Sequence, residues 1–227
     1  MRVFGITLDP RPLAAAAALL AGAAQAGPTT LTFTGSVSTV DAALTGTFHP
    51  GDAVSIVLSY DPAAQDLIPP NPTNAGYPYL AFDLMFGGYS ASFGTQFPNG
   101  VGVLNDTDQG LGPADAFGAS GFQTGAGAPV GGLPLQQGFV TLWDFTQTAF
   151  SGTSLPAAPS FGAFSYRVGG LTFCSNPGCG VGSNMSSVFA DISAMSVVTS
   201  VPEPPSAALV LLSVVAIVAL RVRRRAA

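Results

Sequence analysis

The sequence predicts an all-β fold, an antiparallel β-sandwich of the jelly-roll type. Three observations predict it. Short segments of β-branched and aromatic residues recur along the body of the chain. Turns rich in the chain's 28 glycines and 19 prolines separate them. Helical periodicity is confined to the two ends, which we expect to form an N-terminal signal helix and a C-terminal transmembrane helix. Strand-rich chains of this kind bury their apolar faces between two sheets.

The first half of the body shows the clearest alternation. Leu31, Phe33 and Val37 lie on one face of the first segment, opposite hydroxyl side chains. A Pro-Gly turn and a Gly-Gly turn punctuate the segments that follow, and the residues from 63 to 77 are expected to form a loop. The expected strands are Thr29–Val37, Ala53–Tyr60, Tyr79–Phe86, Tyr89–Phe93 and Gly100–Leu104.

The second half begins with a glycine-rich stretch, 110–132, which is expected to be a long loop. A clear strand then follows, in which Phe139, Thr141, Trp143 and Phe145 alternate with Val140, Leu142 and Asp144. The remaining expected strands are Gly138–Phe145, Phe161–Val168, Leu171–Phe173 and Ser187–Val198. No βαβ pattern interrupts them.

The charge of the body argues against a nucleic-acid partner. Lysine is absent, and residues 27–200 contain ten aspartates, no glutamate and one arginine, which gives a net charge of −9. Phosphate binding needs a basic surface. Serine, threonine and asparagine supply most of the polarity, as in an exported protein.

The N-terminus, 1–26, has the pattern of a secretory signal peptide. Arg2 and Arg11 supply positive charge, and the apolar run ends in Ala24-Gln25-Ala26, a small-x-small cleavage site before Gly27. The alternative is a structural N-terminal helix. We expect cleavage by the secretion machinery and a body, 27–200, outside the cytoplasm.

The C-terminus, 201–227, has three parts in a fixed order: a proline-rich turn, an apolar run and an arginine cluster. The apolar residues 207–220 would form a helix of about 21 Å, short of a bilayer core of about 30 Å. The alternative is a buried core helix, but the arginines that follow favour a transmembrane helix over 206–222 with a cytoplasmic end. The orienting arginines are Arg221, Arg223, Arg224 and Arg225.

This tail resembles the PEP-CTERM sorting signal of Gram-negative bacteria. Val201, Pro202, Glu203 and Pro204 match the Pro-Glu-Pro core of the motif. The opening of the body, with Phe-Thr-Gly-Ser-Val at 33–37, is also similar to PEP-CTERM β-proteins. The resemblance implies recognition by an exosortase-type membrane protease. It further implies transient membrane anchoring, a final place at the cell surface or outside the cell, and a link to exopolysaccharide and biofilm matrix.

Two cysteines, Cys174 and Cys179, enclose a four-residue turn. In an exported chain this spacing favours a disulfide. The alternatives are free thiols, or zinc binding with His49 as one of the further ligands that zinc would need.

Other polar stretches suggest chemistry more weakly. Asn105 to Gly110 could be a calcium loop, but it lacks the calcium-loop spacing, so an Asx turn is favoured. Gly118-Ala119-Ser120-Gly121 approaches a nucleophile elbow with His49 as the base, but a surface turn is favoured.

Two further sets of residues bear on sugars. Asp83 and Asp144 lie on expected strands and could form a glycosidase carboxylate pair. Trp143 and an exposed Tyr77-Pro78-Tyr79 could form a platform for sugar stacking, although core packing is favoured for Trp143.

The sequence as a whole predicts an exported, non-enzymatic surface or matrix protein, with no catalytic residues, cofactor or metal site. The alternative is a carbohydrate-binding module for exopolysaccharide, and a glycan-active enzyme is a third hypothesis.

Overall fold

A computed structural model gives the fold of the body. The described residues are 27–68, 71–108, 110, 112–122, 126–175, 179 and 184–200. The predicted signal peptide, the Pro-Glu-Pro motif, the predicted transmembrane helix and the arginine cluster lie outside them. Within the described ranges, no helix has the length and hydropathy needed to cross a bilayer. Residues Gly27–Ser200 form one compact unit.

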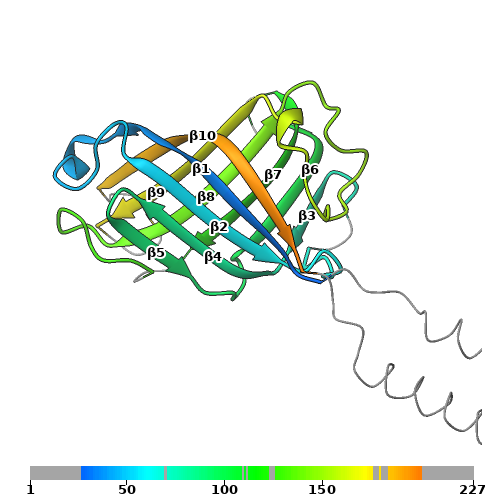
Figure 1. Cartoon of the computed structure of the whole chain (residues 1–227), viewed down its shortest axis with the longest axis horizontal. Helices are drawn as coiled ribbons and strands as arrows, with labels where there is room; N and C mark the ends of the chain where they lie inside the picture. Colours follow the sequence, from blue (N-terminus) through cyan, green and yellow to red (C-terminus); the bar gives the residue numbers. More distant parts are fainter. Residues whose placement is uncertain are drawn as a thin grey trace, which may run out of the picture. The chain divides into compact units, whose positions relative to one another are not determined.

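The described chain is all-β. Its ten strands form one antiparallel sheet in the order β3-β6-β7-β8-β9-β10-β1-β2-β4-β5 (Figure 1). Their bounds are Thr29–Val40 (β1), Ala53–Tyr60 (β2), Asn74–Tyr77 (β3), Tyr79–Phe86 (β4), Tyr89–Phe93 (β5), Gly100–Asp108 (β6), Pro113–Phe122 (β7), Leu135–Asp144 (β8), Tyr166–Cys174 (β9) and Met185–Thr199 (β10). Two short 3-10 helices, η1 (Ala42–Leu44) and η2 (Phe161–Ala163), lie in connections.

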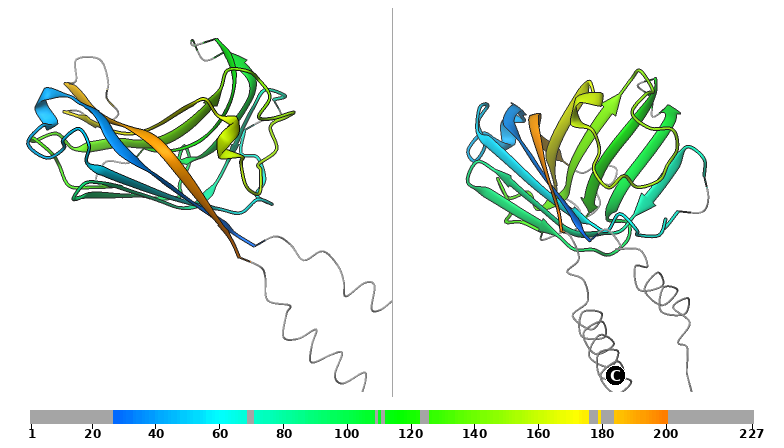
Figure 2. Two further views of the ribbon diagram at one scale, coloured as in Figure 1. Left: turned by 45° about the horizontal axis from the view of Figure 1, so that its top comes forward. Right: turned by 45° about the vertical axis from the view of Figure 1, so that its right-hand side comes forward.

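The expected sandwich of two separate sheets is wrong, because hydrogen bonding runs unbroken across all ten strands. The sheet instead curls until its two halves face each other (Figure 2). The central strands β1 and β10 explain the bend, since their register shifts between Thr34 and Gly35 and again between Val37 and Thr39. Such bulges bend a strand and increase its twist. At Gly35 a side chain would collide with the Asp191 carbonyl of β10.

The core fills the inside of the curl, where the two halves touch. The Phe93 ring on β5 lies where a Cβ would stand at Gly121 of β7 and at Gly138 of β8. Ile56 on β2 approaches Gly169 of β9 in the same way. Glycine at these positions lets large side chains from the opposite half reach the backbone. One curled sheet therefore buries its apolar face as two stacked sheets would.

One of the chain's crossings between the two halves of the sheet passes through Pro78. Tyr77 ends β3 at one edge of the sheet, and Tyr79 begins β4 near the other edge. The exposed position expected for these tyrosines is wrong, because Tyr77 is 7% exposed and Tyr79 is 1% exposed. The Tyr79 hydroxyl donates to the Gly94 carbonyl at 2.9 Å, and burial raises the pKa of Tyr79 to about 12. Both tyrosines beside Pro78 therefore belong to the hydrophobic core.

The strands expected from alternation are confirmed at Ala53–Tyr60, Tyr79–Phe86 and Tyr89–Phe93, and Leu31, Phe33 and Val37 are buried as predicted. Three expectations differ. The expected loops at 63–77 and 110–132 contain β3 and β7. The expected strand at 161–168 begins with η2, and β9 joins its second half to the next expected strand.

Candidate functional site

The outer face of β6, β7 and β8 carries a hollow beside exposed aromatic side chains. Strand register places Gly102, Gly118 and Thr141 in one row across these strands, and Leu104, Ala116 and Trp143 in the next. Their inward neighbours on the same strands, including Val103, Phe117 and Leu142, are fully buried. Small side chains on β6 and β7 beside larger ones on β8 leave a hollow of about 270 Å³ against Trp143.

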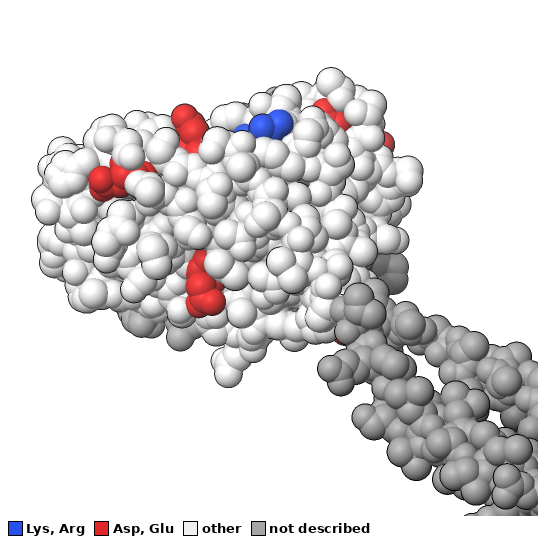
Figure 3. Space-filling view, in the orientation of Figure 1, with Lys and Arg blue, Asp and Glu red and all other residues white. Residues whose placement is uncertain are grey.

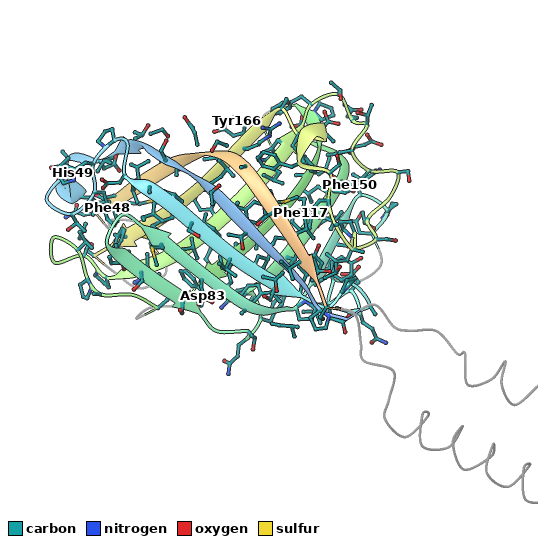
Figure 4. The ribbon with its side chains drawn as sticks, viewed as in Figure 1. Phe48, His49, Asp83, Phe117, Phe150 and Tyr166 are labelled. Carbon is teal, nitrogen blue, oxygen red and sulfur yellow. A yellow bond between two sulfur atoms is a disulfide. The ribbon has the colours of Figure 1, made fainter. Side chains whose placement is uncertain are left out.

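Trp143 is the centre of an aromatic shelf, which we define as Trp143, Phe145 and Tyr166. Tyr166 on β9 is the cross-strand neighbour of Trp143 and is 49% exposed. The Phe145 ring stacks on the indole with 6.3 Å between centroids and 8° between planes. The core position favoured for Trp143 is wrong, because its side chain is half-buried on the outside of the curl. Figure 4 labels Tyr166 of the shelf and Phe117, a core residue of β7.

Asp144 holds the turn that carries Phe145. Its side chain is buried and accepts backbone N–H bonds from Thr146 at 2.9 Å, Thr148 at 2.8 Å and Ala149 at 3.0 Å. Burial alone would raise the pKa of Asp144, but the hydrogen bonds from the backbone and hydroxyls of Thr146 and Thr148 outweigh it and hold the pKa well below its usual range. The carboxylate therefore holds the backbone that follows Phe145, on the inner side of the sheet.

Asp115 is the cross-strand partner of Asp144 and is also fully buried. It accepts the backbone N–H of Asp106 at 3.0 Å and that of Phe150 at 2.8 Å. The two carboxylates thus anchor the first residues of the connection after β8, and their oxygens are occupied by these bonds. Sequence reasoning missed Asp115, because β7 was expected to be a loop and gave no register to pair it with Asp144.

Asp83 and Asp144 do not come together as a catalytic pair. Asp83 lies on β4, in the opposite half of the sheet, and points outward (Figure 4). Its carboxylate accepts the Ser92 hydroxyl at 2.5 Å. Asp144 is buried beneath the β8 turn. One carboxylate is outside the curl and the other inside it, so no sugar could lie between them.

The expected surface turn at 118–121 is wrong, because Gly118 to Gly121 lie within β7. No elbow forms there. His49 lies in the turn between β1 and β2, exposed to solvent, and its backbone N–H donates to the Asp52 carboxylate at 2.8 Å. Ser120 instead lines the hollow beside the shelf.

Of the segment expected as a calcium loop or an Asx turn, Asn105 to Asp108 form the end of β6. Asp108 accepts the backbone N–H of Gly110 at 2.7 Å and that of Gly112 at 3.1 Å, which is the geometry of an Asx turn. Among the residues with described positions, no three His, Cys, Asp or Glu side chains gather closely enough to hold a metal ion.

The predicted disulfide between Cys174 and Cys179 is confirmed, with 5.4 Å between the Cα atoms. Cys174 is buried at the end of β9. The bridge links the end of β9 to Cys179, in the connection to β10.

Charge plays little part in the surface around the shelf. The residues that line the hollow carry no charged side chain. Arg167, the one arginine of the body, donates from Nε to the Phe164 carbonyl at 2.7 Å and lies over the Phe161 ring at 4.1 Å. On the other half of the sheet, where β1, β2 and β4 face the viewer, charged groups are also few and scattered (Figure 3).

The chemistry available at this site is that of binding. Flat aromatic rings, hydroxyls of Ser120 and Thr141, and an uncharged glycine-lined floor suit a ligand with an apolar ring face and a polar edge. No protein-family model matches the chain, and comparison with curated proteins and with solved structures found no similar protein.

Proposed function

We propose that this is an exported, non-enzymatic surface or matrix protein whose body binds carbohydrate on the aromatic shelf. The observation that carries the proposal is the partly exposed Trp143, stacked on Phe145 and flanked by Tyr166 beside an uncharged hollow. A sugar ring presents C–H groups on its face and hydroxyls around its edge. Large aromatic planes supply contact area for such a face, and nearby hydroxyls supply directional hydrogen bonds.

The rigidity of the shelf supports this proposal. Asp144 and Asp115 fix the turn after β8 through backbone hydrogen bonds, so Phe145 is held against Trp143 before any ligand arrives. A preorganised site avoids the entropy cost of ordering side chains on binding. We therefore expect carbohydrate binding with little change in the structure of the body.

The place of action follows from the ends of the chain and from the disulfide. A disulfide persists in oxidising compartments outside the cytoplasm. The signal-like N-terminus and the PEP-CTERM-like tail predict export, transient anchoring and recognition by an exosortase-type protease. Mass spectrometry of the mature C-terminus tests the sorting step, with a chain ending near Pro202 as the expected result and an intact Ala227 as the contrary one.

Glycan-array binding of the exported protein tests the binding step. We expect the wild type to bind neutral polysaccharides and Trp143→Ala to lose at least about tenfold in affinity, or about 1.4 kcal/mol. Phe189→Ala is the matched control, because Phe189 is an outward aromatic on β10, outside the shelf, and is 36% exposed. Equal binding by the wild type and Trp143→Ala would contradict the proposal, as would binding of no glycan.

A further inference from the structure

The hollow beside the shelf continues along the sheet. It shares Gly102 and Ser120 with a second hollow of about 150 Å³ between β3 and β6. The second hollow shares Phe97, Pro98 and Asn99 with a third, of about 470 Å³. Because neighbouring hollows share these residues, the three lie in a row, and we call this row of hollows the β6–β7 groove.

A backbone hydrogen bond and side-chain packing hold one wall of the groove in place. On the far side of β3, the Leu67 backbone N–H donates to the Gly76 carbonyl at 2.7 Å, and the Ile68 side chain lies where a Cβ would stand at Gly76. This hydrogen bond and the packing of Ile68 hold an apolar wall along the edge of the sheet. At Gly102, in the floor, a Cβ would meet nothing within 4 Å, so the depression there is open space above the backbone.

A second pair of aromatic residues closes the end away from the shelf. Phe97 is 74% exposed and Phe122 is 47% exposed, and both line the third hollow. Asn99 lies between them, is 4% exposed, accepts the Phe122 N–H at 2.7 Å and donates to the Gly94 carbonyl at 2.7 Å. The buried Asn99 amide thus ties the backbone of Phe122, at the end of β7, to that of Gly94, which follows β5.

We propose that the ligand is a linear, uncharged polysaccharide bound lengthwise in the β6–β7 groove, with one subsite at the aromatic shelf and another at Phe97 and Phe122. The segment from Ala116 to Phe122 of β7 spans about 20 Å at about 3.4 Å per residue, which is longer than a single sugar. The residues lining all three hollows include no charged side chain, so an anionic chain finds no cation there. This inference rests on the proposed function and adds the length and chemistry of the ligand.

Calorimetry with oligosaccharides of increasing length tests the inference. The probes are neutral β-1,4-linked glucose and N-acetylglucosamine oligomers, from dimer to hexamer, added to the full-length protein. For the series that binds, we expect the hexamer to bind at least about tenfold more tightly than the dimer. Gly102→Val, which fills the middle of the groove, should bring this ratio close to one, and Phe97→Ala should lower it.

Gly46→Val is the matched control, because Gly46 also has nothing within 4 Å of its Cβ position and lies in the turn after η1. It should keep the wild-type ratio, and all three variants should keep the wild-type melting temperature. Equal affinity for dimer and hexamer in the wild type would overturn the lengthwise groove and leave shelf binding intact. Binding of no neutral glycan, in calorimetry and on the array, would overturn both proposals, and so would groove-dependent binding of an uncharged peptide alone.

Discussion

The two faces of β7 and β8 differ although they belong to the same strands. Inside the curl, Phe117, Val140 and Leu142 are fully buried, and the Phe117 ring packs against Tyr60 on β2, in the opposite half of the sheet. Outside, Gly118 and Ser120 leave open surface, and Trp143 is half-buried. Because successive side chains of a strand point to opposite faces, one short segment can supply the core and a surface site together.

Because inward and outward residues alternate along each strand, substitutions can be chosen that test stability and binding separately. Substitutions on the inner face should unfold the body, whereas substitutions on the outer face should change the site. Asp144 lies between these cases, since its side chain points inward but its hydrogen bonds hold the turn beneath Phe145.

The largest expected effect is that of Phe117→Ala, on the inner face. Removing a fully buried phenylalanine leaves a cavity and should lower the free energy of unfolding by about 3–5 kcal/mol. Urea denaturation, followed by circular dichroism, measures the change. A loss of less than about 1 kcal/mol would mean that packing around Phe117 contributes little to the stability of the curled sheet.

Asp144→Asn should have an intermediate effect. The amide cannot accept all the N–H bonds that the carboxylate accepts, so the free energy of unfolding should fall by about 1–3 kcal/mol. Asp83→Asn is the control, because Asp83 is exposed and its loss should change stability by about 0.5 kcal/mol or less. If the two variants were equally stable, Asp144 would not be an anchor.

Acid should destabilise the body through the same residue. The pKa of Asp144 is lowered in the folded state, so its contribution is fully present above the unfolded pKa of about 3.9 and is lost as pH falls toward the folded pKa. Melting temperatures between pH 5 and pH 2 test this, because the loss begins near the unfolded pKa and continues below it. The wild type should lose more stability than Asp144→Asn over that range, and parallel losses would point to other carboxylates.

Trp143→Ala, on the outer face, should destabilise the body less than Phe117→Ala does. Its side chain is half-buried, so the free energy of unfolding should fall by about 1 kcal/mol, far less than for Phe117→Ala. The same urea titration measures both. A loss as large as that of Phe117→Ala would show that Trp143 is a structural residue first.

Sequence alone predicted much of the fold where alternation was strong. The strands around Leu31, Ile56 and Leu84 were expected, as was the β8 alternation of Val140 and Leu142. The curl was not, because bulges in β1 and β10 leave no mark in a pattern of period two. Strand β7 was missed because Gly118 and Gly121 replace the apolar residues that usually signal a strand.

The candidate site was predictable only in part. The alternation that buries Leu142 places Trp143 outside, but an indole is more often a core residue. The pattern alone therefore did not show whether Trp143 lies in the core or on the surface. The burial of Tyr79 depends on the crossing at Pro78, and the pairing of Asp115 with Asp144 depends on the register of β7 and β8. Both are long-range features, fixed by how the sheet closes and not by neighbouring residues.

Tryptophan fluorescence tests the central claim most directly, because Trp143 is the only tryptophan in the chain. If a sugar covers the aromatic shelf, titration with the neutral polysaccharide that binds best should shift the emission to shorter wavelength and protect the indole from quenching by acrylamide. Both changes should saturate at the affinity measured by calorimetry. Unchanged emission and quenching at a ligand concentration that saturates binding would show that the carbohydrate site lies elsewhere on the body.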